Sequence, residues 1–309
     1  MLLEIAAADA YGAVFEGCEL DFCMSHNDLT FDATHELPSL VPPGAYTDDT
    51  QMSLAVAEAL LQDLEWTKEK IADKFVECFQ RDKRRGYTTA FLILLINSNT
   101  GKELLSKIGG NSTKSGAAMR SCPLGLIPKL QELKEKTIIQ AIVTHNSDPG
   151  VLSALMVAFA THYNYYKLGD KKDMKLWIED EISHPSHFVM SKDSWGTDEW
   201  YHGDLKAQWN QGNPWVYKIP VPCDGVQCAS AAIDAVSMHD NMADILKECV
   251  NMGGDTDTTA AIAAGIASVC SDVENNIPES LMSKLENKTY GKDYLKRLDA
   301  HLLEKYRKE

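Results

Sequence analysis

The apolar residues of the chain recur mostly at the spacing of α-helices. Residues 71–79 show this spacing, and so does a stripe in the i, i+3, i+4, i+7, i+8 register formed by Met52, Ala55, Val56, Ala59 and Leu60. The pattern predicts amphipathic helices. Residues 151–160 and 258–269 are apolar on nearly every side, which predicts helices buried on all faces.

Local signals mark where some of these helices begin and end. Asp148 followed by Pro149 predicts an N-cap with proline at the first helical position. Alanine and glycine are frequent in residues 258–269, so neighbouring helices can approach that segment closely. Residues 281–305 predict one or two amphipathic C-terminal helices. Strand signals are sparse, since the chain has neither a long alternation of β-branched and polar residues nor an Asn-Gly hairpin.

Residues 183–224 are the least regular part of the chain. They contain several prolines and most of the tryptophans, namely Trp195, Trp200, Trp209 and Trp215. Such a length is unusual for a loop inside a compact domain, so we expect an ordered insert or lid. The whole pattern predicts one all-α domain over residues 1–309, with an irregular, aromatic-rich insert at about 183–224.

Composition and charge narrow the classes of function. The chain has 309 residues, of which 44% are hydrophobic and 24% are charged, as expected for a globular protein with a sizeable core. The formal net charge of −15 repels nucleic-acid backbones and excludes general nucleic-acid binding. One small phosphorylated ligand is not excluded, because it needs only a local cluster of donors.

The cysteines and the N-terminus bear on the compartment. The cysteines are scattered without a Cys-x-x-Cys pair, so neither a zinc ribbon nor a thioredoxin motif is expected. The first residues carry an early acid and no basic segment, unlike a signal peptide. The apolar run at 91–96 is far too short to span a bilayer. We expect a cytoplasmic protein with free thiols and no membrane partner.

Two acidic clusters stand just ahead of predicted helices. Thr47, Asp48 and Asp49 precede the helix at Met52, where acids alone would be explained by helix capping and the helix dipole. Residues 253–259, Gly-Gly-Asp-Thr-Asp-Thr-Thr, precede the second buried helix. The two glycines allow a tight turn. The alternating Asp-x-Asp then directs two carboxylates to one spot, with a hydroxyl next in line.

Together the clusters offer four carboxylates and two threonine hydroxyls. These hard oxygens suit Mg²⁺ or Mn²⁺. Four carboxylates balance the charge of two divalent ions, which favours a binuclear centre with ions ~3.5–4 Å apart. An EF-hand is excluded, because Ala260 and Ile266 occupy the positions of its glycine and glutamate. The Asp-x-Asp-x-Thr of haloacid-dehalogenase-type phosphatases also matches residues 255–259; this less favoured alternative predicts an α/β fold and release of inorganic phosphate.

Four blocks of the sequence carry a family resemblance. They are Ala-Asp-Ala-Tyr-Gly-Ala-Val-Phe-Glu at 8–16, Tyr-Thr-Asp-Asp-Thr at 46–50, Gly-Ala-Ala-Met-Arg with Pro-Leu-Gly within 116–125, and the second acidic cluster at 253–259. Thr144-His145 with Asp148-Pro149 is a weaker fifth match. In these blocks the chain resembles the ADP-ribosylglycohydrolases, the family of the dinitrogenase-reductase-activating glycohydrolase and the eukaryotic ADP-ribosyl-acceptor hydrolases.

The resemblance implies an all-α fold with two Mg²⁺ ions, Mn²⁺ being the alternative, at the mouth of an ADP-ribose cleft. The implied metal ligands are Thr47, Asp48, Asp49, Asp255, Asp257 and Thr258. Glu16 would lie across the cleft as an acidic gate. The implied phosphate loop lies at about 110–116, and the substrate-binding candidates are Ser112, Thr113, Ser115, Gly116, Met119 and His145. The chain departs from the family at Ala8, in place of glycine, and at Lys114-Ser115, where Gly-Asn is common.

We therefore predict a metal-dependent hydrolase that removes ADP-ribose from a modified acceptor, with mono-ADP-ribosylated arginine as first choice and serine as second. Cleavage of a ribosyl bond passes through an oxocarbenium-like state that two carboxylates commonly manage. Glu16, Asp48 or Asp49 would activate the water or protonate the leaving group. A non-catalytic ADP-ribose-binding or crystallin-like relative is the alternative. Arg120 is expected to be structural and to bridge acids.

Overall fold

The structure consists of helices joined by loops and short turns. The computed structural model describes residues 1–32, 41–183, 205, 209 and 213–307. Its helices are α1 (Leu2–Gly12), α2 (Leu20–His26), α3 (Asp48–Leu61), α4 (Lys68–Arg81), α5 (Thr89–Ile96), α6 (Gly101–Lys107), α7 (Leu130–Ile142), α8 (Asp148–Tyr166), α9 (Met174–Ser183), α11 (Gly225–Met238), α12 (Met242–Met252), α13 (Thr256–Ala267), α14 (Glu279–Met282) and α15 (Lys292–Lys305). Short 3-10 turns are η2 (Ser115–Ala117), η3 (Cys122–Leu126) and η4 (Lys171–Asp173).

The predicted fold class is confirmed. Across the described residues the backbone forms isolated bridges but no strand, so the α/β phosphatase alternative is wrong. Their buried apolar side chains form one continuous core that runs from Met1 to Leu302. Within the same residues no helix combines the length and the apolar character needed to cross a membrane. All eight cysteines are free thiols, as expected.

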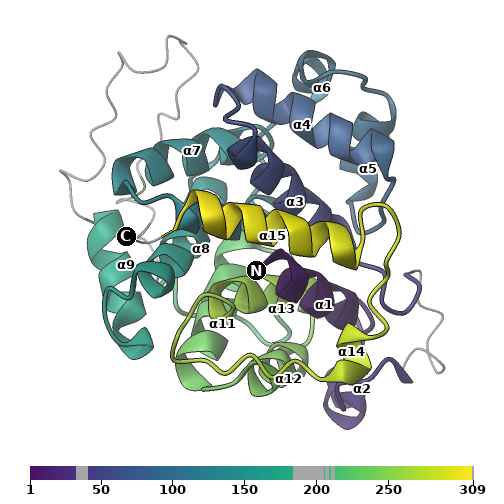
Figure 1. Cartoon of the computed structure of the whole chain (residues 1–309), viewed down its shortest axis with the longest axis vertical. Coiled ribbons are helices and arrows are strands. Elements are labelled where there is room, and N and C mark those ends of the chain that lie inside the picture. The colour runs from purple at the N-terminus through teal and green to yellow at the C-terminus, as the bar shows by residue number, and fades with distance from the viewer. Residues whose placement is uncertain (33–40, 184–204, 206–208, 210–212, 308–309) are drawn as a thin grey trace.

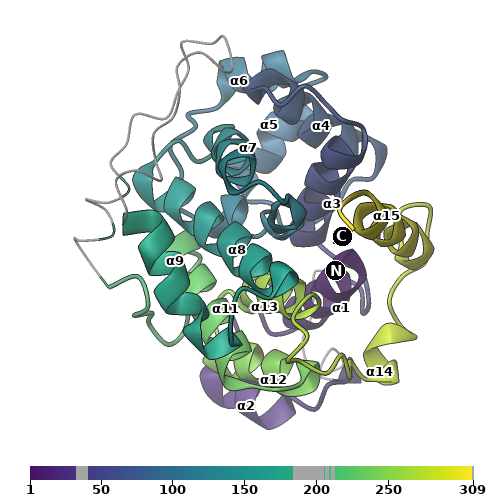
Figure 2. The same ribbon diagram turned by 60° about the vertical axis from the view of Figure 1, so that its left-hand side comes forward.

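Helix α13 lies at the centre, between α1, α8, α11 and α12 (Figure 1, Figure 2). Each of its residues is buried, because small side chains let the neighbouring helices approach closely. A Cβ added at Gly265 would lie 2.5 Å from Cys122 Sγ. A Cβ added at Gly12 of α1 would lie 2.5 Å from the Cα of Asp257. The prediction of a buried helix with close neighbours is confirmed.

Helix α3 differs from its predicted pattern, whereas α4 follows it. The helix at Met52 is present, but Leu54 and Ala57, which lie off the predicted stripe, are buried as well. A one-sided α3 is therefore wrong: the helix is covered by α1, α4 and α15 on different sides. In α4 the apolar residues at 71–79 are buried and Glu77 is exposed, as expected of an amphipathic helix.

The start of α8 lies one residue before the predicted cap. Ser147 is the N-cap, because its Oγ accepts a hydrogen bond from the backbone N of Gly150 at 3.2 Å. Asp148 and Pro149 therefore occupy the first two helical positions, and the prediction of Asp148 as the cap is wrong. At the C-terminus, the region predicted to form one or two helices forms two, α14 and α15.

The predicted insert at 183–224 is described in part. Residues 184–204, 206–208 and 210–212 lie outside the described residues, and Trp195 and Trp200 lie with them. Trp209 is buried, and its ring meets that of Trp215 edge to face with 5.7 Å between ring centroids. These two tryptophans therefore pack against each other.

Candidate active site

The two acidic clusters meet at the N-termini of α3 and α13. Both line one end of a cavity of ≈ 420 Å³. The turn before α13 depends on Gly253 and Gly254, whose φ angles of 66° and 81° lie in the left-handed region. A Cβ at Gly254 would lie 2.0 Å from the carbonyl oxygen of Val221, which accepts from the backbone N of Asp255 at 2.8 Å. The predicted tight turn is confirmed, and it directs Asp255 and Asp257 into the cavity.

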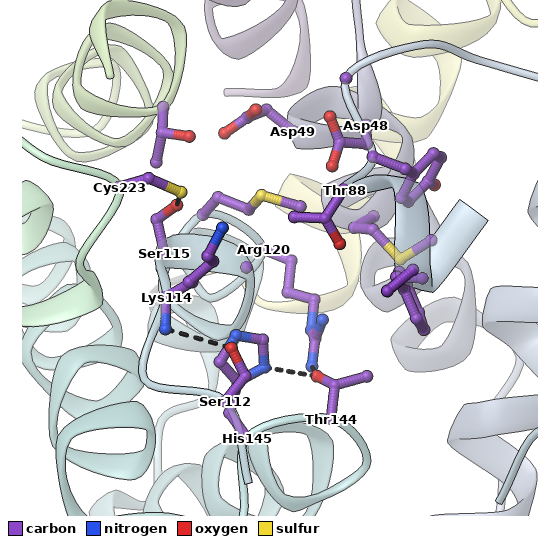
Figure 3. A pocket seen from close by; sticks show the side chains of 18 of the residues that line it. Asp48, Asp49, Thr88, Ser112, Lys114, Ser115, Arg120, Thr144, His145 and Cys223 are labelled. Carbon is purple, nitrogen blue, oxygen red and sulfur yellow. Dashed lines mark hydrogen bonds between the residues drawn. The ribbon is translucent and has the colours of Figure 1, made fainter. Parts of the chain in front are cut away.

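The carboxylates lie close enough together to share a ligand. Oxygens of Glu16, Asp255 and Asp257 lie within 4.8 Å of one another. Asp48 and Asp49 line the same end of the cavity, and Figure 3 shows them along one edge of it, opposite His145 and Ser112. The Oδ1 atom of Asp49 is buried and has no hydrogen-bond partner among the described residues. This atom is available to a ligand that the protein itself does not supply.

Burial and mutual repulsion make these acids hard to ionise. Burial, then the neighbouring carboxylates, raise the pKa values of Asp48, Asp49 and Asp257 well above their ordinary range. Burial, then Asp255 and Asp9, likewise raise the pKa of Glu16. A divalent cation would offset this repulsion, and oxygen donors are the ligands that Mg²⁺ and Mn²⁺ prefer. The acidic cluster therefore fits a divalent metal ion.

Asp9 of α1 holds the first acidic cluster in place. This fully buried carboxylate accepts from Thr47 Oγ1 at 2.7 Å, from the backbone N of Thr50 at 3.0 Å and from Thr50 Oγ1 at 2.5 Å. It also accepts from the backbone N of Thr47 at 2.9 Å. Because the Thr47 side chain caps no N–H of its own helix, Asp9 caps α3 from another helix. Thr47 itself is buried and does not line the cavity. Because its hydroxyl donates to Asp9, the lone pairs of the hydroxyl oxygen remain free.

The role of Asp9 is missing from the sequence analysis, although a signal for it exists. It is the single aspartate in a helix otherwise made mostly of leucine, isoleucine and alanine. Gly86 was also missed. Its φ is 99°, and a Cβ there would lie 1.9 Å from Asp48 Oδ1. No residue with a side chain fits at this position while Asp48 keeps its place.

The opposite side of the cavity contains most of the predicted substrate-binding residues. Those that line it are Ser112, Ser115, Gly116, Met119 and His145. Thr113 does not line it: its side chain is exposed, and its carbonyl oxygen accepts from the backbone N of Gly225 at 3.0 Å. Ser115 links this side to the acids, since its Oγ donates to Asp255 Oδ2 at 3.0 Å.

Arg120 is structural, as predicted, but it does not bridge acids. Its fully buried guanidinium donates to the carbonyl oxygen of Gln140 and to Thr144 Oγ1, each at 2.8 Å. It also lies 4.5 Å above the ring centroid of Phe75. Amide and hydroxyl groups replace the expected carboxylates, because the acids gather at the other end of the cavity.

An apolar wall completes the cavity. Tyr87, Phe91 and Leu94, on or next to α5, line it together with Ile108. Lys114 and Cys223 also line it, and Figure 3 shows the Lys114 side chain extending into the cavity. No local sequence signal predicts this wall, because only the fold brings α5 next to the acidic clusters.

Comparison with known proteins identifies the family. The sequence model of the ADP-ribosylglycohydrolase family matches residues 1–309. The chain belongs to this family. The glycohydrolase is 25% identical over 303 residues to the ADP-ribosylhydrolase ARH3 of Xenopus tropicalis, covering 86% of this chain and 84% of that protein. It is 26% identical over 313 residues to ARH3 of Gallus gallus, covering 84% and 81%.

A solved structure agrees with the sequence comparison. The fold matches a chain of an ADP-ribosylglycohydrolase-related protein complex with a TM-score of 0.65, covering 99% of this chain and 95% of that one at 21% identity. The predicted all-α fold and the predicted glycosidic-bond hydrolase are thus confirmed. The glycohydrolase is an enzyme that removes ADP-ribose, so the non-catalytic alternative is set aside.

Proposed function

We propose that this glycohydrolase is metal-dependent and holds two Mg²⁺ ions, or Mn²⁺ in their place, between α3 and α13. The observation that carries the proposal is the buried Asp49 Oδ1, which lacks a partner among the described residues and lies where the two acidic clusters meet. The proposed ligands are Thr47, Asp48, Asp49, Asp255, Asp257 and Thr258. Four carboxylates balance the charge of two divalent ions. This balance would relieve the mutual repulsion of the buried carboxylates.

The residues around the ions would then carry out the hydrolysis. When bound, divalent ions supply Lewis acidity that polarises water and orients ribose hydroxyls. The acidic cluster stabilises the positive charge that develops on the ribose ring. Glu16, Asp48 or Asp49 takes a proton from the attacking water or gives one to the leaving group. Glu16 is suited to this role, because it lines the cavity and its carboxylate lies within 4.8 Å of those of Asp255 and Asp257.

The rest of the cavity suits the remainder of ADP-ribose. Its volume of ≈ 420 Å³ falls within the range of small-molecule sites. The apolar wall of Phe91, Leu94 and Ile108 offers a surface for the adenine ring. Residues of the loop at 110–116 line the cavity opposite Asp48 and Asp49 (Figure 3), and the diphosphate would bind there. The acceptor is proposed to be a mono-ADP-ribosylated protein side chain, arginine before serine.

The test is release of ADP-ribose, measured by mass spectrometry, from arginine-linked, serine-linked, O-acetyl and poly(ADP-ribose) substrates. Release from a protein-linked substrate with Mg²⁺, and none with excess chelator, is expected. Release from O-acetyl-ADP-ribose alone would overturn the proposed acceptor. Full release in a metal-free preparation would overturn the proposed metal dependence.

Three variants, each measured for bound metal and for release of ADP-ribose, assign the roles of the acids. Glu16→Gln should keep the metal ions and slow release about a hundredfold or more, as expected for loss of a proton-transferring group. Asp257→Ala should lose both metal and release. Glu69→Gln, a matched change at an exposed acid of α4, should behave as wild type. Loss of metal in Glu16→Gln with normal metal binding in Asp257→Ala would reverse these assignments.

A further inference from the structure

Three buried side chains that line the cavity, Arg120, Thr144 and His145, are joined by hydrogen bonds. Arg120 Nη2 donates to Thr144 Oγ1 at 2.8 Å, and Thr144 Oγ1 lies 2.6 Å from Nδ1 of His145. All three residues are more than nine-tenths buried. Figure 3 shows them in one row, with the His145 ring between Thr144 and the loop that carries Ser112. The metal ligands take no part in this row.

The direction of these hydrogen bonds fixes where the imidazole proton lies. A guanidinium can only donate, so Thr144 Oγ1 accepts from Arg120. The hydroxyl has one hydrogen, and Nδ1 of His145 is the acceptor within reach among the described residues. Nδ1 is therefore unprotonated, and the neutral ring carries its hydrogen on Nε2. The opposite tautomer would leave the buried hydroxyl hydrogen of Thr144 without an acceptor, which costs free energy.

The Nε2–H group of His145 has no hydrogen-bond acceptor among the described residues. Nε2 is buried, while His145 lines the cavity. The ring also has little freedom to turn away. A Cβ at Gly116 would lie 3.0 Å from Cε1 of His145, and a Cβ at Gly150 would lie 2.6 Å from its Cβ. The two glycines thus let the backbone close around a fixed ring.

We propose that Arg120 and Thr144 are positioning residues that hold His145 as the Nε2–H tautomer, which donates a hydrogen bond to an acceptor oxygen of a bound anionic ligand. Under the proposed function, on which this part rests, the ligand is ADP-ribose. His145 is then a permanent donor and takes no proton from water or substrate. Burial and, after it, the charge of Arg120 lower the pKa of His145 to about 3, in agreement with a neutral ring.

The test compares variants of Thr144 in protein labelled with ¹⁵N-histidine, with His145→Gln used to assign the signal. Nuclear magnetic resonance at pH 7 should show a hydrogen on Nε2 in the wild type and in Thr144→Ser, which keeps the hydroxyl. Thr144→Val removes the hydroxyl and should place hydrogen on Nδ1 in part or all of the molecules. A matched control, Thr161→Val, removes another buried hydroxyl, which donates to the Val157 carbonyl oxygen at 2.9 Å, and should leave the tautomer unchanged.

Binding provides the second readout. Titration of ADP-ribose in the presence of Mg²⁺ should show affinity about tenfold or more lower in Thr144→Val, as expected for one hydrogen bond to a charged group. Thr144→Ser and Thr161→Val should bind as wild type. Hydrogen on Nδ1 in the wild type, or an unchanged tautomer in Thr144→Val, would overturn the proposal. Because the spectra are taken without ligand, failure of the wild type to bind ADP-ribose would contradict the proposed substrate separately.

Discussion

Replacing Asp9 with asparagine changes a single atom of the carboxylate that caps α3. Oδ2 of Asp9 accepts from the backbone N of Thr47 at 2.9 Å and from the backbone N of Thr50 at 3.0 Å. An amide NH₂ at this position would face two backbone donors, whereas at Oδ1 it would face only the backbone N of Thr47, at 3.1 Å, so the asparagine should place its NH₂ at the Oδ1 position. There it would donate to Thr47 Oγ1, which in the wild type donates to Oδ1 at 2.7 Å. The hydrogen bond of Thr47 would therefore be reversed.

The expected cost follows from the hydrogen bonds that lose their charged acceptor. Those from the backbone N of Thr47, the backbone N of Thr50 and Thr50 Oγ1 become neutral. A charged bond is worth about 1 kcal/mol more than a neutral one, so Asp9→Asn should lower the free energy of unfolding by about 3 kcal/mol. Relief of repulsion on Asp48 and Asp49 would offset part of this in metal-free protein. The melting temperature should fall by roughly 6–12 °C before that offset.

The reversed hydrogen bond should also weaken metal binding. In Asp9→Asn a lone pair of Thr47 Oγ1 is occupied and its hydrogen is free to point at the proposed metal, so Mn²⁺ affinity should fall at least about tenfold. The assay is calorimetric titration of Mn²⁺ together with a thermal melt. Thr100→Ala is the control. Thr100 is the N-cap of α6, and its Oγ1 accepts from the backbone N of Glu103 at 3.2 Å. The substitution should cost about 1 kcal/mol and leave Mn²⁺ affinity unchanged. Wild-type melting and wild-type affinity in Asp9→Asn would refute the reasoning.

Two further substitutions test the site and the core. Gly86→Ala should displace Asp48 and strongly reduce ADP-ribose release. Gly17 also has a positive φ, but a Cβ added there would have no atom within 4 Å, so Gly17→Ala should cost stability but not activity. Equal activities of the two variants would refute this. Burial raises the pKa of Glu58, but hydrogen bonds from Arg81 and Tyr294 outweigh it and hold the pKa below 4.5. The stability that Glu58 adds is therefore present above pH 4.5 and is lost as the pH falls through the lowered pKa of Glu58. Urea unfolding should show Glu58→Gln destabilised at neutral pH and much less destabilised in acid. A pH-independent difference would contradict this.

Local sequence signals predicted the parts of the fold that depend on nearby residues. The glycine pair before Asp255 predicted the turn because positive φ is a property of the residue itself. The small residues of α13 predicted close helix neighbours for a similar reason. The start of α8 was misplaced by one residue because Ser147 and Asp148 are both good N-caps, and the spacing to Gly150 decided between them.

Contacts between distant parts of the chain were not predictable in this way. Asp9 and Thr47 belong to different helices, so the cap that joins them appears only when α1 and α3 pack together. The requirement for glycine at 86 arises from Asp48, which precedes it by a long stretch of chain. The amphipathic pattern of α3 failed because burial of its remaining faces depends on α15, at the other end of the sequence.

The most direct test of the account is a Mn²⁺ titration of metal-free protein followed by electron paramagnetic resonance. If the acidic clusters of α3 and α13 form one binuclear centre, the wild type should bind two ions per chain and show the spectrum of a spin-coupled pair. The double variant Asp48→Asn, Asp255→Asn, altered once in each cluster, should lose that spectrum. An isolated Mn²⁺ signal in the wild type, or a coupled pair that persists in the double variant, would contradict the account.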